Sequence, residues 1–157
     1  MTIQLPNFTN AMLNRVAQGD MSIFEEGHDF TLTERAEYKN WNALIVAATK
    51  GNLNLVNRLI EIEAVIENAA AGDNYALSAA AEKAHLDVVN RLLKNNEVST
   101  NATAAGNGAL RWAAWNGHLK VVNRLLEIAE VRANAAAVDN FALRVAAANG
   151  HSEVVHA

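Results

Sequence analysis

The sequence contains no cysteine among its 157 residues. This absence excludes disulfides, thiolate nucleophiles, zinc knuckles and iron–sulfur clusters, and it is compatible with a reducing compartment. No apolar run approaches the roughly 18 residues that cross a bilayer. The amino terminus also lacks the basic start and long apolar stretch of a signal peptide. We therefore predict a soluble, cytoplasmic protein without membrane insertion.

Basic and aromatic residues are also scarce. Lys and Arg number 13 against 17 Asp and Glu, which gives a net charge of −4 and argues against a nucleic-acid partner, because such binders concentrate cations to neutralise phosphates. Aromatic residues make up 6% of the chain, whereas 51% is hydrophobic and 31 residues are alanine. This composition excludes overall disorder and favours closely packed helices with small side chains.

The chain repeats itself every 33 residues. The dipeptide Ala-Leu begins at Ala43, Ala76, Ala109 and Ala142, so each copy follows the previous one by 33 residues. Two further series keep the same spacing: Gly51, Ala84, Gly117 and Gly150, and the Asn-Arg pairs that begin at Asn57, Asn90 and Asn123. A constant period of this length indicates an array of stacked structural units.

One unit contains two amphipathic segments. Apolar residues at i, i+3 and i+4 precede Gly117, which is the pattern of a short helix and its stop signal: Leu110, Ala113 and Ala114. A second apolar stripe predicts a longer helix over 118–128. Each unit is therefore predicted to be a helix pair plus a turn, and it needs its neighbours to bury its apolar face.

The third unit carries a recognisable motif. Residues 108–127 read GALRWAAWNGHLKVVNRLLE. This segment resembles the T-P-L-H-x-A-A-x-x-G-H-L-x-V-V-x-x-L-L run of the ankyrin repeat, and the likeness extends over residues 38–157. The resemblance implies an all-α, ankyrin-like repeat solenoid of stacked helix-turn-helix units with a 33-residue period.

The sequence departs from that family pattern at the end of the second helix. The usual glycine is replaced by Glu63, Asn96 and Ala129, of which only Asn readily adopts a left-handed backbone. We expect this helix either to run on or to end by a different turn.

The two ends of the chain differ from the regular units. Residues 1–37 are predicted to form a degenerate amino-terminal capping unit, followed by an array over 38–157 with three full units and a truncated fourth. The last helix leaves Val154 and Val155 without a next layer. Either the chain is a fragment of a longer array, or this end frays or binds a partner, with self-association among the options.

Neither a metal site nor a catalytic site is predicted. The histidines that recur once per unit lie about 10 Å apart at packed-helix distances, too far to share a metal at bonds of about 2 Å: His85, His118 and His151. Each is expected to cap or pack at the turn between helices. The serines stand in unrelated contexts and the glycines form no phosphate-binding loop. We expect no catalytic residues, no metal, no cofactor and no enzymatic activity.

Three asparagine series recur with the repeat and receive structural interpretations. The first is predicted to cap the amino terminus of the first helix: Asn74, Asn107 and Asn140. The second is predicted to bond nearby backbone in the connecting turn: Asn68, Asn101 and Asn134. The third lies beside leucines on the second helix, where it can bridge to the neighbouring unit: Asn57, Asn90 and Asn123.

Positions that vary between units are the candidates for recognition, because stacking demands sameness and recognition does not. The family resemblance implies a concave surface made of turn tips and the exposed side of the first helices. Mapped by repeat position, the candidate protein-binding residues are Trp115, Asn116, Trp41, Lys50, Glu82, Lys83, Asn149 and Lys39.

Trp115 is the leading anchor of this set. An exposed indole supplies contact area and a hydrogen-bond donor, and the alternative for Trp115 is packing against a neighbouring unit. Trp112 aligns with Ala79 and Val145 and is predicted to pack in the core. Trp41 is either an anchor or a lid on the amino-terminal cap.

These observations predict a non-catalytic scaffold that binds a partner protein on its concave face. The alternative is a targeting or regulatory arm of a larger enzyme that is truncated at its carboxyl terminus. The N-R-L-L-E and A-L-R-x-A-A segments also resemble ankyrin arrays in secreted effectors of intracellular bacteria. That resemblance implies a host protein as partner and the host cytosol as the place of action.

Overall fold

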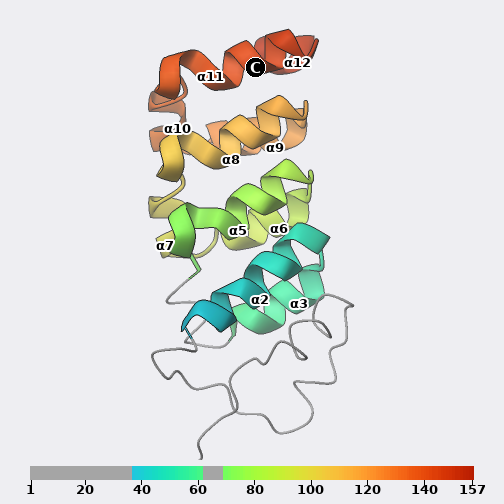
Figure 1. Cartoon of the computed structure of the whole chain (residues 1–157), viewed down its shortest axis with the longest axis vertical. Helices are drawn as coiled ribbons and strands as arrows, with labels where there is room; N and C mark the ends of the chain where they lie inside the picture. Colours follow the sequence, from blue (N-terminus) through green and yellow to red (C-terminus); the bar gives the residue numbers. More distant parts are fainter. Residues whose placement is uncertain (1–36, 62–68) are drawn as a thin grey trace, which may run out of the picture.

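Helices stacked in layers form the part of the chain that the structure describes, residues 37–61 and 69–157 of a computed structural model. These residues contain helices and no strands, which confirms the all-α prediction. The layers follow one another along the long axis of the molecule (Figure 1). The predicted capping unit at 1–37 lies outside the described residues except for Glu37.

Each layer is built on an antiparallel pair of helices. The first helices are α2 (Glu37–Lys50), α5 (Ala71–Glu82), α8 (Ala104–Trp115) and α11 (Ala137–Ala148). The second helices are α3 (Leu53–Ile60), α6 (Leu86–Leu92), α9 (Leu119–Leu126) and α12 (Ser152–Val155). First helices pack on first helices and second helices on second helices in the next layer. The predicted repeat solenoid is confirmed.

A short third helix, which the sequence analysis did not predict, follows the second helix in two units. These helices are α7 (Asn96–Thr100) and α10 (Ala129–Ala133), and they lie beside the helix pairs on one edge of the stack (Figure 1). Helix α9 ends at Leu126 rather than near 128, so the second helix does end by a different turn. The third helix forms because one apolar residue in each is fully buried, Val98 in α7 and Val131 in α10.

The core lies between layers and combines alanines of the first helices with Leu and Val of the second. Ala113 and Leu125 are both 0% exposed, and burial of a Leu side chain contributes roughly 1.5–3 kcal/mol. The conserved spacing places Leu44, Leu77 and Leu110 at one position, all within 3% of full burial, whereas Leu143 at the same position is 47% exposed. The layer that follows is therefore what buries this residue.

Histidines join each layer to the previous one at the turn between the helices. His118 Nε2 lies 2.8 Å from the carbonyl oxygen of Glu82, and His85 and His151 make the same bond to Thr49 and Trp115 at 3.0 Å. The structural role predicted for the histidines is confirmed. The ring of His151 covers Gly117, where an added Cβ would lie 2.5 Å from Nδ1 and where φ is +71°.

The first asparagine series was predicted incorrectly. Asn74 and Asn107 do not cap α5 and α8; both have left-handed backbones, with φ of +62° and +60°, and both are buried. Asn107 Nδ2 instead donates to the carbonyl oxygens of Val131 and Asn134, at 3.2 and 2.6 Å. Asn74 does the same to Val98 and Asn101 at 2.8 and 3.1 Å. The short third helix exposes carbonyls at its end, and a donor on a left-handed turn is what satisfies them.

The other two asparagine predictions are confirmed at four of the described residues, Asn57, Asn90, Asn101 and Asn134, whereas Asn123 is exposed and makes no bond to another described unit. Asn101 and Asn134 each donate from Nδ2 to the carbonyl four residues earlier, at 2.9 Å in both units. On the second helices, Arg91 Nε donates to Asn57 Oδ1 and Arg124 Nε donates to Asn90 Oδ1, each at 2.7 Å. These two bonds tie α3 to α6 and α6 to α9. Asn68 lies outside the described residues.

Candidate protein-binding surface

The large apolar side chains that the described residues expose all lie on first helices. They are Tyr75 on α5 at 55%, Trp112 and Trp115 on α8 at 45% each, and Leu143 on α11 at 47%. We call the exposed side of α2, α5, α8 and α11 the first-helix face. Leu143 occupies the repeat position at which the other units bury a leucine between layers, whereas the tyrosine and the two tryptophans occupy other repeat positions. Exposed large hydrophobic groups that gather on one face mark a surface for binding.

Two neighbouring layers share an aromatic patch on this face. The rings of Trp115 and Phe141 stack with centroids 6.3 Å apart and an angle of 18° between their planes. The guanidinium carbon of Arg111 lies 4.9 Å from the centre of the Phe141 ring. We define the aromatic patch as Trp112, Trp115 and Phe141. It spans α8 and α11, and Arg111 borders it.

Both interpretations of Trp115 describe part of its surroundings. Its ring packs on Phe141 of the next layer, yet 45% of the residue remains accessible. Stacking fixes the indole in one position, and a rigid aromatic group loses less conformational entropy when a partner binds. Trp115 is therefore an exposed and oriented side chain.

The prediction for Trp112 was wrong, because the residue is 45% exposed rather than buried. Ala79 and Val145 occupy the same repeat position and are 7% and 9% exposed. The space at this position suits an alanine or a valine, and an indole is too large for it. The excess area of Trp112 lies in solvent, which a comparison of side-chain volumes at this repeat position would have indicated.

Two predicted residues, Asn116 and Asn149, lie close to Trp115. Asn149 Nδ2 donates to the carbonyl oxygen of Trp115 at 3.1 Å, and Asn116 Nδ2 donates to that of Trp112 at 2.9 Å. Both residues are exposed. Their amide nitrogens therefore hold the end of α8, and their remaining polar atoms border the aromatic patch.

The charged candidates belong to earlier layers than the aromatic patch. Lys50 is exposed at the end of α2, and Lys83 Nζ lies 2.9 Å from Glu82 Oε1 at the end of α5. They lie on other layers of the stack than α8 (Figure 1). Trp41 and Lys39 belong to α2, and their side chains lie outside the described set.

Sequence reasoning missed Tyr75, Phe141, Arg111 and Arg144 as surface residues. Tyr75 and Phe141 share a repeat position with Gly108, and Arg111 and Arg144 share one with Ser78. Such variation from aromatic to glycine, or from serine to arginine, was the available signal. The stack of Phe141 on Trp115 depends on the distance between layers and has no sequence signature.

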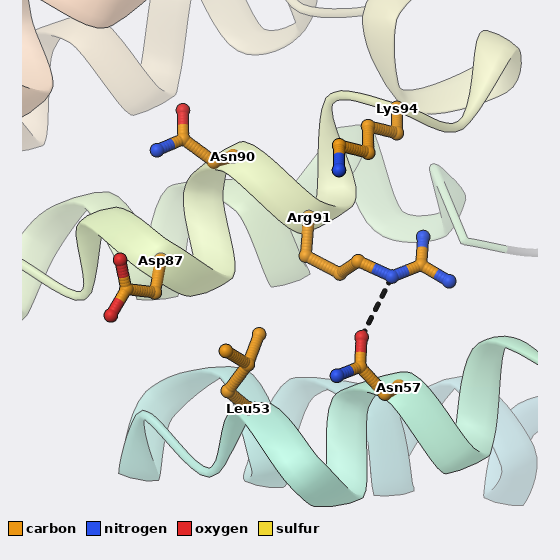
Figure 2. Close-up of a pocket in the computed structure, with 6 residues that line it drawn as sticks. All are labelled: Leu53, Asn57, Asp87, Asn90, Arg91 and Lys94. Carbon is orange, nitrogen blue, oxygen red and sulfur yellow. Dashed lines mark hydrogen bonds between the residues drawn. The ribbon is translucent and has the colours of Figure 1, made fainter.

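A shallow groove of about 370 Å³ lies on the opposite side of the array, between α3 and α6. Figure 2 shows its lining residues: Leu53, Asn57, Asp87, Asn90, Arg91 and Lys94. The bond from Arg91 to Asn57 crosses this groove (Figure 2). Because its polar groups already tie two layers together and it exposes no large apolar side chain, the groove has the character of a structural seam.

The described residues offer little for other kinds of site. Among the side chains that the structure describes, no three His, Asp or Glu come close enough to hold a metal ion. No helix within residues 37–61 and 69–157 is long and apolar enough to span a membrane.

The chain belongs to the ankyrin repeat family. A family model of ankyrin repeats, comprising three copies, matches residues 16–104, 44–137 and 77–157. Among solved structures, the chain is similar to the X-ray structure of an ankyrin repeat family protein from Legionella pneumophila, with 30% sequence identity and a TM-score of 0.68. The match covers 97% of this chain and 46% of that one, so this chain spans less than half of its neighbour. No curated protein matches the sequence.

Proposed function

We propose that this chain is a non-catalytic scaffold that binds a partner protein on its first-helix face, the face expected to be concave in this family. Ankyrin repeats in general are modules for protein–protein interaction. The observation that supports the proposal most directly is the pair of indoles on α8, each 45% exposed.

Physical chemistry favours this face over the other. Tryptophan and arginine dominate the energetics of many protein interfaces, and the aromatic patch combines both. The helices that carry the patch pack on each other and on further helices, α8 on α5 and α11 on α12, so little conformational entropy is lost when a partner binds. The opposite side presents polar second helices whose residues already bond one another.

Affinity capture with single variants tests the proposal. The wild-type chain, Trp112→Ala, Trp115→Ala and the control Lys120→Ala are immobilised and exposed to a lysate of the source cells. A partner retained by the wild type and by Lys120→Ala should be reduced at least tenfold by either tryptophan variant, which corresponds to about 1.4 kcal/mol. Lys120 is exposed on the second helix α9 and serves as the matched surface control.

A thermal melt of each variant accompanies the capture. Trp112→Ala should melt close to the wild type because its indole is half in solvent. Equal recovery of the partner by all four proteins would contradict the proposed face.

A second candidate function is a targeting or regulatory arm of a larger enzyme. It is favoured by one observation: the matched Legionella protein is more than twice as long as the region that this chain covers. The bacterial origin of that structure also supports a host protein as the partner and the host cytosol as the place of action. Detection of the natural product by antibody tests the idea, because a mass well above 16.9 kDa supports the arm and a band at that mass opposes it.

A further inference from the structure

The charges around the aromatic patch carry information about the partner. On the second helices, Arg58 and Arg124 pair with glutamates of their own unit, Glu61 at 2.9 Å and Glu127 at 3.1 Å. The arginines of the first helices differ in that, within the described structure, they form no such ion pairs. Arg111 and Arg144 have no carboxylate within ion-pair distance among the described residues.

Arg111 is held in place but keeps unused donors. Its Nη1 donates to the carbonyl oxygen of Ala105 at 3.1 Å, and its guanidinium lies over Phe141. Its Nε is buried and has no hydrogen-bond partner within the described structure. A guanidinium has five N–H donors in a fixed planar arrangement that matches a carboxylate, so most of its capacity remains open.

Arg144 repeats this position one layer further along. It lies three residues after Phe141 and therefore on the same side of α11 as that ring. The residue is exposed, and no hydrogen bond or ion pair holds its side chain in the part of the chain that the structure describes. Helix α8, which carries Arg111, contains no Asp or Glu, and α11, which carries Arg144, contains one, Asp139.

We propose that the occupant of the aromatic patch is an acidic peptide segment of the partner protein. An apolar side chain of that segment packs on Trp112 and Trp115, and its carboxylates bind Arg111 and Arg144. This inference rests on the proposed function and specifies its partner class. A cationic segment is disfavoured because both arginines would repel it and because Arg111 already covers one side of Phe141.

The spacing of the two arginines also specifies the segment. Packed helices in adjacent layers lie about 8–10 Å apart. In a polyproline-type chain the rise is about 3.1 Å per residue with three residues per turn, so side chains at i and i+3 share a side and lie about 9 Å apart. An extended segment with carboxylates three residues apart therefore matches the spacing of the two arginines.

Selection from a random displayed 12-residue peptide library tests the inference without knowledge of the partner. The bait is the full chain, in parallel with Arg144→Gln, Arg111→Gln, the control Arg132→Gln and the double variant Trp112→Ala/Trp115→Ala. Arg132 is exposed on α10, which is not one of the first helices. The readout is the composition of the selected peptides and the affinity of one selected peptide for each variant.

The expected result is enrichment of Asp and Glu together with Leu, Phe or Trp. Affinity should weaken about two- to fivefold in Arg144→Gln, the upper part of the range for a solvent-accessible charge pair, and should be unchanged in Arg132→Gln. The same peptide should bind more weakly as salt is raised. Arg144→Gln is the decisive variant because, among the described residues, its side chain has no hydrogen bond or ion pair to lose, whereas Arg111→Gln also removes the contact with Phe141.

The outcomes separate this inference from the proposed function. Peptides rich in apolar residues but neutral or basic, lost in the double tryptophan variant, would overturn the acidic partner and leave the first-helix face standing. Peptides that bind the double tryptophan variant as well as the wild type would overturn both, as would a library that yields no binder. Tighter binding of oligouridine RNA than of any selected peptide would replace the acidic segment with a nucleic acid.

Discussion

The two helices of each unit differ in role: the second helices carry contacts that repeat between layers, and the first helices carry exposed side chains that vary. On the second helices the same contacts recur: Arg91 to Asn57 and Arg124 to Asn90 have equal lengths of 2.7 Å. On the first helices the equivalent positions change from layer to layer, from Ser78 to Arg111 and from Ala79 to Trp112. Within the described residues, large apolar side chains are exposed only on the first helices.

This difference shows where sequence variation is tolerated. A side chain that bonds the next layer is constrained by that layer, so its identity repeats with the period. A side chain that faces solvent is free of this constraint and can differ in every unit. The four predictions below test how strictly the repeated contacts hold the array, in order of decreasing effect.

A charge placed between layers should unfold the array. Val122→Asp puts a carboxylate at a position on α9 that is 3% exposed and has no counter-ion, which should cost about 4 kcal/mol or more. Circular dichroism at increasing temperature measures the loss. The control is Lys120→Asp, an exposed site on the same helix, where a change within about 0.5 kcal/mol is expected. A folded Val122→Asp variant of wild-type stability would refute the stacked core.

The buried asparagine at the left-handed turn should matter more than its exposed counterpart. Asn107→Ala removes two bonds to the end of α10 and should lower the free energy of unfolding by about 2–3 kcal/mol. Asn140 has nearly the same backbone, with φ of +56°, but is exposed. Asn140→Ala should therefore cost only about 1 kcal/mol, mainly from the left-handed alanine. Equal losses in urea titrations would show that conformation, not hydrogen bonding, selects Asn.

Removal of one arginine–asparagine hydrogen bond between second helices should lower the free energy of unfolding by a similar, modest amount in either layer. Arg91→Ala and Arg124→Ala each delete a bond to an asparagine of the previous layer, worth about 1 kcal/mol, and Arg124→Ala also removes the exposed ion pair with Glu127, worth less than about 1 kcal/mol. Arg132→Ala, on the exposed side of α10, is the control. Chemical denaturation measures all three. Losses of unfolding free energy that differ by more than about 1 kcal/mol between the two variants would show that the two bonds, although equal in length, do not contribute equally to stability.

The smallest effect should be a gain of stability at the turn of the second unit. Ala84 stands where other units have glycine, and its φ is +61°. A left-handed alanine costs roughly 1–2 kcal/mol, and glycine loses about 0.5–1 kcal/mol of chain entropy, so Ala84→Gly should stabilise the chain by about 0.5 kcal/mol. Ala133→Gly, on the exposed side of α10, should destabilise it by a similar amount. A lower melting temperature for Ala84→Gly than for the wild type would contradict this account of the turn.

Local patterns predicted the layered part of the fold well, because the same pattern occurs in every unit. The alanines and leucines of the two helices are spaced by one or two helical turns, and the glycine and the histidine directly follow the first helix, so short segments of sequence are enough to recognise them. The prediction for Asn101 held for the same reason, since its bond to Glu97 spans four residues. Asn107 was misread because its acceptors, Val131 and Asn134, lie 24 and 27 residues away on an unpredicted helix.

The sequence by itself determined the period, the helix pairs and the contacts that repeat, since each follows from residues a fixed number of positions apart. Only the tertiary structure decided which variable side chains reach solvent. Trp112 is exposed because its indole is larger than the Ala79 and Val145 side chains that are buried at the same repeat position, and Trp115 is oriented because Phe141 of another layer lies against it. The space available to a side chain depends on the distance between layers, which is set by every side chain packed there. No single segment of the sequence is therefore enough to predict it.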